Sequence, residues 1–146
     1  MDKVIIDTSA WIESFRPQCD TAFVHLVKDL IIKERVLLPG IIKAELLRGT
    51  RNKKEYNRLN DLLKGVTYLP VPEEFWEKLA AFSFDLFKNG IVVPLTDTYI
   101  ALLCVEHNAL LLHRDKHFDL IARKSPLRLF LHEKNGKYDP LLIHSP

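Results

Sequence analysis

Short runs of adjacent aliphatic residues alternate along this chain with segments that have the spacing of amphipathic helices. The first run is Val4-Ile5-Ile6, and a later one is Leu110-Leu111-Leu112. A strand with one face in water alternates apolar and polar side chains, so continuous apolar runs indicate strands covered on both faces. Strands that alternate with helices are typical of βαβ units. The pattern therefore predicts an α/β domain with a mainly parallel, five-stranded sheet.

The predicted elements occupy most of the chain. Strands are expected at residues 3–6, 35–38, 67–71, 109–112 and 127–131. Helices are expected at residues 10–15, 22–33, 41–47, 54–63, 73–88, 96–107 and 116–122. Residues 1–131 are expected to form one domain, and residues 132–146 a C-terminal tail that is either docked, through residues 141–143, or loose.

Composition limits the classes of protein that remain possible. The 146 residues are 47% hydrophobic, which is enough for a core, and the net charge of +2 permits a nucleic-acid partner without establishing one. Every apolar run is shorter than the roughly 20 residues of a membrane-spanning helix, and no signal-peptide pattern is present. We therefore expect a cytoplasmic protein with no membrane partner. Two cysteines, Cys19 and Cys104, cannot make a disulfide framework, and neither belongs to a CxxC pair.

Four isolated acidic residues stand where apolar runs end or where a helix turns inward: Asp7, Glu45, Asp97 and Asp115. The carboxyl ends of parallel strands lie at one edge of a sheet, so these acids can meet there. Two carboxylates about 4 Å apart repel by roughly 4 kcal/mol at an effective dielectric constant near 20, so one binds a proton or a cation lies between them. Oxygen-only ligands favour a hard cation, Mg²⁺ or Mn²⁺.

Asp7 and Asp115 also have a structural interpretation, because each precedes a predicted helix and could cap it. For the first helix, Thr8 or Ser9 could serve as the cap instead, which would leave Asp7 for function. Asp119, four residues beyond Asp115, could face the same crevice or solvent, and we rank it below the four acids.

Glu45 and Asp97 lie within predicted helices. Glu45 could form a local ion pair with Arg48, three residues further on. Asp97 could complement the helix dipole, but it shares a helical stripe with Ile100 and Cys104. An uncompensated charge on that buried stripe would be costly, which favours a function for Asp97.

Each acid lies in a short segment with a recognisable pattern. The segments are a hydrophobic run followed by Asp-Thr-Ser at residues 4–9, a Pro-x-x-x-x-x-Glu-Leu pattern at 39–46, and residues 95–101 and 111–118. In this order and approximate spacing, they resemble the motifs of the PIN-domain family, and most closely those of the VapC-type ribonuclease toxins of prokaryotic toxin–antitoxin pairs. The resemblance extends from about residue 3 to residue 131.

The resemblance implies a three-layer α/β/α sandwich in which Asp7, Glu45, Asp97 and Asp115 are catalytic and bind Mg²⁺ or Mn²⁺. It also implies an endoribonuclease that hydrolyses RNA through a metal-activated water, a cognate antitoxin and a homodimer. At one position the chain departs from the pattern: His113 stands where many members have Ser or Thr.

Several side chains next to the acids are candidate RNA-binding groups: Thr8, Ser9, Arg48, Arg114, Lys116 and His117. Cations near an acidic centre could guide a phosphate backbone, although a basic run more commonly forms a solvated helix face. His113 and His117, with Cys104 or Asp115, could suggest zinc, but no CxxC or HExxH pattern supports that metal.

Three alternatives to the toxin interpretation remain open. One is a catalytically silent PIN-like domain that binds RNA or a partner, and another is a PIN nuclease of RNA processing. A third, a receiver-like phosphoacceptor, is weak because Asp7 stands alone where a receiver needs adjacent acids.

Segment 75–87 contains more aromatic residues than one narrow helix stripe can hold. Core packing explains most of them, and the surplus suggests a second buried surface.

Overall fold

A parallel sheet is the centre of the computed structural model, which describes residues 1–130 and 143–144. Its strands are β1 (Val4–Ile6), β2 (Val36–Pro39), β3 (Thr67–Leu69), β4 (Leu110–Leu112), β5 (Arg128–Phe130) and β6 (Ile143–His144). Their order across the sheet is β3-β2-β1-β4-β5-β6. The first five strands pair in parallel, as the sequence predicts, and β6 pairs antiparallel to β5.

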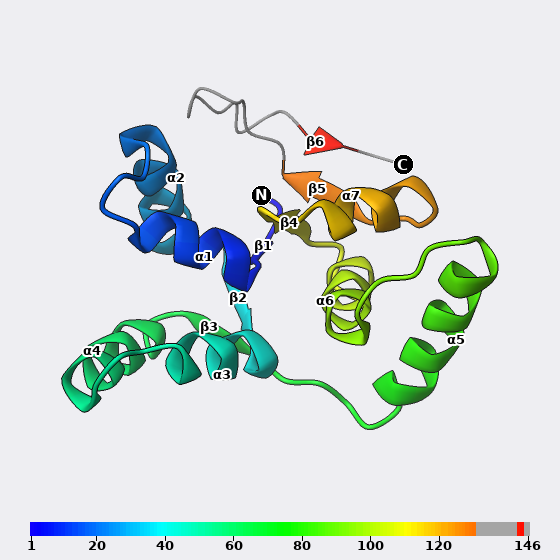
Figure 1. Ribbon diagram of the computed structural model, residues 1–146, viewed down its shortest axis with the longest axis horizontal. Helices are drawn as coiled ribbons and strands as arrows, with labels where there is room; N and C mark the ends of the chain where they lie inside the picture. Colours follow the sequence, from blue (N-terminus) through cyan, green and yellow to red (C-terminus); the bar gives the residue numbers. More distant parts are fainter. Residues whose placement is uncertain (131–142, 145–146) are drawn as a thin grey trace.

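The helices of the described residues agree with the predicted segments. They are α1 (Thr8–Phe15), α2 (Thr21–Ile32), α3 (Gly40–Arg48), α4 (Lys53–Leu63), α5 (Phe75–Lys88), α6 (Leu95–Glu106) and α7 (Lys116–Arg123). In Figure 1, α1 and α2 lie on one side of the sheet, and α6 and α7 lie on the other. The three-layer α/β/α sandwich is therefore confirmed.

The core fills the space between these layers. Val4–Ile6 and Leu110–Leu112 are fully buried on β1 and β4, which explains why their sequences do not alternate. Trp11, Phe23 and Phe118 pack against the sheet from α1, α2 and α7. Among the described residues, no helix combines the length and apolarity needed to span a membrane.

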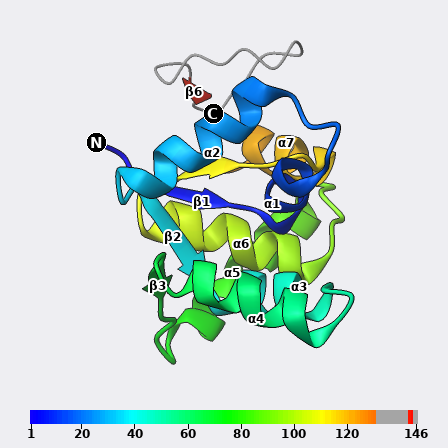
Figure 2. The same cartoon turned by 90° about the vertical axis from the view of Figure 1, so that its left-hand side faces the viewer.

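The carboxyl ends of the parallel strands open toward one edge of the sheet. Figure 2 shows β1 and β4 running in the same direction, with α1 and α7 at the ends toward which they point. The backbone N–H of Asp7 donates to the carbonyl of Leu112 at 2.9 Å, which extends the β1–β4 pairing to this edge. The segments that follow β1 and β4 therefore begin next to each other at this edge of the sheet.

The predicted domain boundary at residue 131 stays a prediction, because most of residues 132–146 lie outside the described residues. Within this tail, residues 143–144 are described and form β6. The pairing of Leu129 with His144 and of Phe130 with Ile143 adds this strand to the edge of the sheet.

Candidate metal-dependent active site

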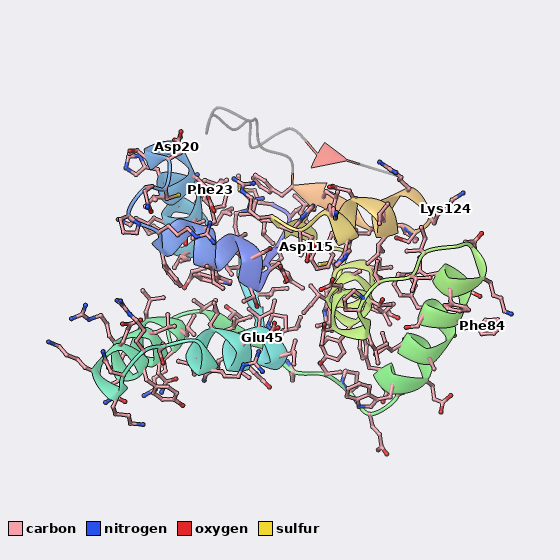
Figure 3. The ribbon with its side chains drawn as sticks, viewed as in Figure 1. Asp20, Phe23, Glu45, Phe84, Asp115 and Lys124 are labelled. Atoms are coloured by element: carbon pink, nitrogen blue, oxygen red, sulfur yellow. The ribbon has the colours of Figure 1, made fainter. Side chains whose placement is uncertain are left out.

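The four predicted acids meet at the carboxyl edge of the sheet. Asp7 follows β1, Glu45 lies in α3 after β2, Asp97 is in the first turn of α6, and Asp115 precedes α7. Asp7 experiences the charges of Asp97 and Glu45, and Asp97 experiences those of Asp115 and Glu45. In Figure 3, Glu45 and Asp115 lie near the centre of the view. Residues separated by up to 108 positions thus form one cluster, here called the acid cluster.

Asp7 is both the N-cap of α1 and a member of the acid cluster. Its Oδ2 accepts hydrogen bonds from the Ser9 backbone N–H at 3.1 Å and from the Ser9 hydroxyl at 2.5 Å. The expectation that Thr8 or Ser9 would supply the cap is therefore wrong: α1 begins at Thr8, so Asp7 occupies the capping position. Burial raises the pKa of Asp7, the Ser9 bonds lower it, and the charges of Asp97 and Glu45 raise it, with a net increase.

Ser9 also connects Asp7 to the loop between β4 and α7. Its hydroxyl oxygen accepts a hydrogen bond from the Arg114 backbone N–H at 3.0 Å. The Arg114 guanidinium lies 4.2 Å from the ring centre of Phe23, in a cation–π contact with α2. One hydroxyl thereby joins two segments that carry acids of the cluster.

Glu45 is held by a contact between helices. The Thr8 hydroxyl donates to Glu45 Oε1 at 2.8 Å, joining α1 to α3. Among residues 1–130, Glu45 forms no ion pair with Arg48. The local ion pair that could have given this acid a purely structural role is therefore not formed within this part of the chain. Arg48 and Lys116 are both exposed, and their predicted contact with RNA stays a prediction.

Asp97 and Asp115 approach each other through His117. Asp115 caps α7, and its Oδ1 accepts from the His117 backbone N–H at 3.0 Å. His117 Nδ1 lies 2.8 Å from Asp97 Oδ2 and 3.3 Å from Asp115 Oδ1. Burial raises the pKa of Asp97, the His117 bond lowers it, and the charge of Asp115 raises it, with a net increase. The sequence analysis considered His117 as an RNA contact, a surface residue or part of an improbable zinc site with Asp115, and it did not place His117 beside Asp97.

His113 supports the backbone that carries Asp115. Its Nδ1 accepts a hydrogen bond from the Asp115 backbone N–H at 3.0 Å, and its Nε2 lies 3.4 Å from Asp119 Oδ1. The bond to Nδ1 requires the ring proton on Nε2, facing Asp119. Burial lowers the pKa of His113, although nearby acids, Asp119 first among them, raise it. A ring nitrogen thus orients the loop at the position where a hydroxyl residue was expected.

His113→Leu should weaken divalent-cation binding about ten-fold, the lower end of the range for residues that orient metal ligands. Leucine keeps the bulk but leaves the Asp115 N–H without an acceptor. His113→Asn should retain most of the affinity, because its amide oxygen can take the place of Nδ1. Titration of Mn²⁺ binding to both variants tests this role, and equal losses in the two would contradict it.

The donor set of the acid cluster fits a divalent cation. Among residues 1–130, no lysine or arginine forms an ion pair with any of the four acids. One ligand atom from each of Asp97, Asp115 and His117 lies within 4.8 Å of the others. Asp7 and Glu45 lie outside this group and are linked to Asp97 through the interaction of their charges. Cys104 is outside that group and fully buried, and burial raises the pKa of its thiol. The described residues therefore support a carboxylate-rich site and not a cysteine-containing zinc site.

The fold and the acid cluster define an α/β/α domain with a carboxylate site at the carboxyl edge of its sheet. A family model described as the PIN domain matches residues 4–124. Ribonuclease VapC11 of Mycobacterium tuberculosis is 33% identical over 129 residues, which cover 86% of this chain and 96% of that protein. The chain belongs to the PIN-domain family, and within it to the VapC-type proteins.

Two solved structures share the fold at lower sequence identity. VapBC-1 from nontypeable Haemophilus influenzae matches with a TM-score of 0.67 and 23% identity, over 82% of this chain and 92% of that one. A toxin–antitoxin complex from Klebsiella pneumoniae matches with a TM-score of 0.61 and 15% identity, over 78% and 88% of the two chains. These similarities concern the arrangement of helices and strands.

Proposed function

We propose that this protein is an endoribonuclease that uses Mg²⁺ or Mn²⁺ to hydrolyse RNA, as the toxin of a VapBC-type pair. The observation that supports it best is the acid cluster, in which four carboxylates gather and none is in a Lys or Arg ion pair found among residues 1–130. The ribonuclease name of the VapC11 relative supports the same activity. The cytoplasm stays the predicted location.

Asp7, Glu45, Asp97 and Asp115 would hold the cation. The bound metal would supply a lowered pKa for the attacking water and positive charge for a phosphate oxygen. Water is the nucleophile, so no side chain is needed for that role. The task of the chain's own residues is to hold the carboxylates in position. The products should carry a 5′ phosphate and a 3′ hydroxyl.

The hydroxyl residues beside the cluster provide this positioning. Ser9 fixes one carboxylate oxygen of Asp7, and Thr8 fixes one of Glu45. Among the hydrogen bonds of residues 1–130, Asp7 uses only Oδ2, so Oδ1 is left for a ligand. Exposed Arg48 and Lys116 flank the cluster in sequence and can meet the phosphates on either side of the scissile bond.

Removal of divalent cations tests the proposed function directly. Cleavage of a mixed RNA substrate by the purified protein should fall to background in EDTA and return when Mg²⁺ or Mn²⁺ is added in excess. Several kcal/mol of charge stabilisation would be lost with the ion, which corresponds to about a thousand-fold in rate. Undiminished cleavage in EDTA would eliminate the metal mechanism. A protein that binds RNA but cleaves none under any of these conditions would support the silent-domain alternative.

An apolar groove beside the acid cluster supports an antitoxin partner. Its volume is about 440 Å³, and its walls come from α3, α5 and α6, including Ile41, Trp76, Leu95 and Tyr99. Trp76 and Leu95 are 57% and 60% exposed, an unusual arrangement unless a partner covers them. The Klebsiella structure is a toxin–antitoxin complex. We infer that a segment of the cognate antitoxin occupies this groove and places one of its own positively charged side chains against the acids.

Trp76→Ser should weaken binding of the antitoxin encoded by the adjoining gene by at least ten-fold, because a large aromatic side chain that a partner covers is a typical binding hot spot. RNA cleavage by the free variant should stay near normal. Ile32→Ser is the matched control, since Ile32 is 78% exposed but lies outside the groove. Isothermal titration of the three proteins measures the difference, and equal affinities for all three would exclude this groove.

The exposed aromatic residues of α5 support a homodimer. Phe84 and Phe87 are 59% and 62% exposed and lie outside the apolar groove. Two apolar rings in water favour burial against a second copy of the chain. Sedimentation velocity of the free protein would test this: a monomer at all concentrations would contradict it.

A further inference from the structure

His117 occupies the position in the acid cluster where a cation would be expected. Its Nδ1 is 2.8 Å from Asp97 Oδ2 and 3.3 Å from Asp115 Oδ1. Its backbone N–H also donates to Asp115 Oδ1 at 3.0 Å, so the residue is fixed to the cluster by its main chain as well. Its side chain is 34% exposed, which leaves access from solvent.

The spacing of these atoms matches that of neighbouring ligands around one metal ion. Bonds of about 2.1 Å at right angles place adjacent ligand atoms about 3.0 Å apart. The two separations from His117 Nδ1 lie on either side of that value. Asp97, Asp115 and His117 also form the group of potential ligand atoms that lies within 4.8 Å in the described residues. A small movement would therefore let a single ion contact both carboxylates and the imidazole.

We propose that His117 is a nitrogen ligand of the cation in this site and makes the site prefer Mn²⁺ to Mg²⁺. This inference rests on the proposed metal dependence. Mg²⁺ prefers oxygen ligands and retains its waters, whereas imidazole is a ligand of transition-metal ions. An all-carboxylate cluster would accept either ion on similar terms. The imidazole adds a contact that benefits Mn²⁺ selectively.

Binding of Mn²⁺ to the full-length protein gives a readout that is independent of catalysis. Pulsed electron paramagnetic resonance of the Mn²⁺ complex should show ¹⁴N coupling from a directly bound nitrogen. His117→Ala should abolish that coupling and weaken Mn²⁺ binding about ten-fold, a change typical of altered metal environments. Mg²⁺ affinity, measured by competition, should change less than three-fold. His25→Ala is the matched control because His25 is an exposed histidine on α2.

His117→Asn separates ligation from hydrogen bonding. Its amide can still donate to Asp97, but its side-chain oxygen is the only ligand atom that it offers to a metal, so the ¹⁴N coupling should be lost. Retained coupling in the alanine variant, or Mn²⁺ binding by the wild type without ¹⁴N coupling, would overturn the nitrogen-ligand assignment while leaving metal dependence intact. A wild type that binds neither ion would overturn both. Equal losses of Mn²⁺ and Mg²⁺ affinity in His117→Ala would contradict the selectivity.

Discussion

Asp97→Asn should reduce RNA cleavage about a thousand-fold at saturating Mg²⁺, the rate equivalent of several kcal/mol of lost metal-assisted stabilisation. Asn preserves the shape of the side chain and can still bond to His117, but its amide is a neutral, weaker ligand. Asp97 interacts with the charges of the other three acids, Asp7, Glu45 and Asp115, and its carboxylate is hydrogen-bonded to His117. Its charge is therefore central to holding a divalent cation.

Glu77→Gln is a matched control for the position of Asp97 in its helix. Both acids lie in the first turn of a helix, Glu77 in α5 and Asp97 in α6, so each complements a helix dipole. Glu77 is exposed and outside the acid cluster, and its substitution should leave cleavage within two-fold of normal. Single-turnover rates and Mg²⁺ titrations of both variants would show whether Asp97 acts by binding the metal or only by complementing the helix dipole. A similar small effect in both would mean that Asp97 serves only the helix.

The sheet and the meeting of the acids could be predicted because both follow from short-range patterns. Runs such as Val4-Ile5-Ile6 need cover on both faces, and parallel strands then place Asp7 and Asp115 at one edge. The direction of Asp97 followed from the period of its helix, since Ile100 and Cys104 on the same stripe are buried.

Details that depend on the path of a loop could not be predicted in this way. Three adjacent residues, Asp7, Thr8 and Ser9, can each cap a helix, and the sequence does not say at which one α1 begins. The direction of the His117 ring depends on how the chain turns between β4 and α7. One signal was available: His117 is two residues beyond the capping acid Asp115, which places it in the first turn beside the cluster.

β6 was also beyond sequence reasoning. It has two residues, Ile143 and His144, too few to establish an alternating or continuous apolar pattern. The strand follows turn signals at Asn135-Gly136 and Asp139-Pro140, which indicate a tail more strongly than a strand. Its place in the sheet depends on the unpaired edge of β5, a tertiary feature.

Asp7→Asn should reduce RNA cleavage about a thousand-fold, as for Asp97→Asn. The same substitution should raise the midpoint of thermal unfolding of the metal-free protein at neutral pH. Asn is as good an N-cap as Asp, so the bonds from Ser9 are retained. The buried negative charge and its repulsion by Asp97 and Glu45 are removed. Activity and stability should therefore change in opposite directions at this residue.

The raised pKa of Asp7 determines how the stability difference between Asp7→Asn and the wild type should change with pH. The pKa of Asp7 is raised on folding, so its protonated form is favoured in the folded state, and that contribution is lost as pH rises through the folded pKa. The stability advantage of Asp7→Asn should thus be largest at neutral pH and disappear as pH falls below the pKa of an ordinary aspartate. Saturating Mg²⁺ should stabilise the wild type and narrow the same difference.

Two substitutions distinguish loss of charge from loss of the cap. Asp7→Ala removes both and should be less stable than Asp7→Asn by about 1 kcal/mol, the usual value of an N-cap. Asp20 is the matched control: it caps α2 by accepting from the Ala22 N–H at 2.7 Å, but it is exposed and outside the acid cluster. Asp20→Asn should change neither RNA cleavage nor the way in which stability depends on pH. If Asp7→Asn were less stable than the wild type at neutral pH without metal, the Asp7 charge would be compensated within the fold, and a divalent cation would not be needed to neutralise it.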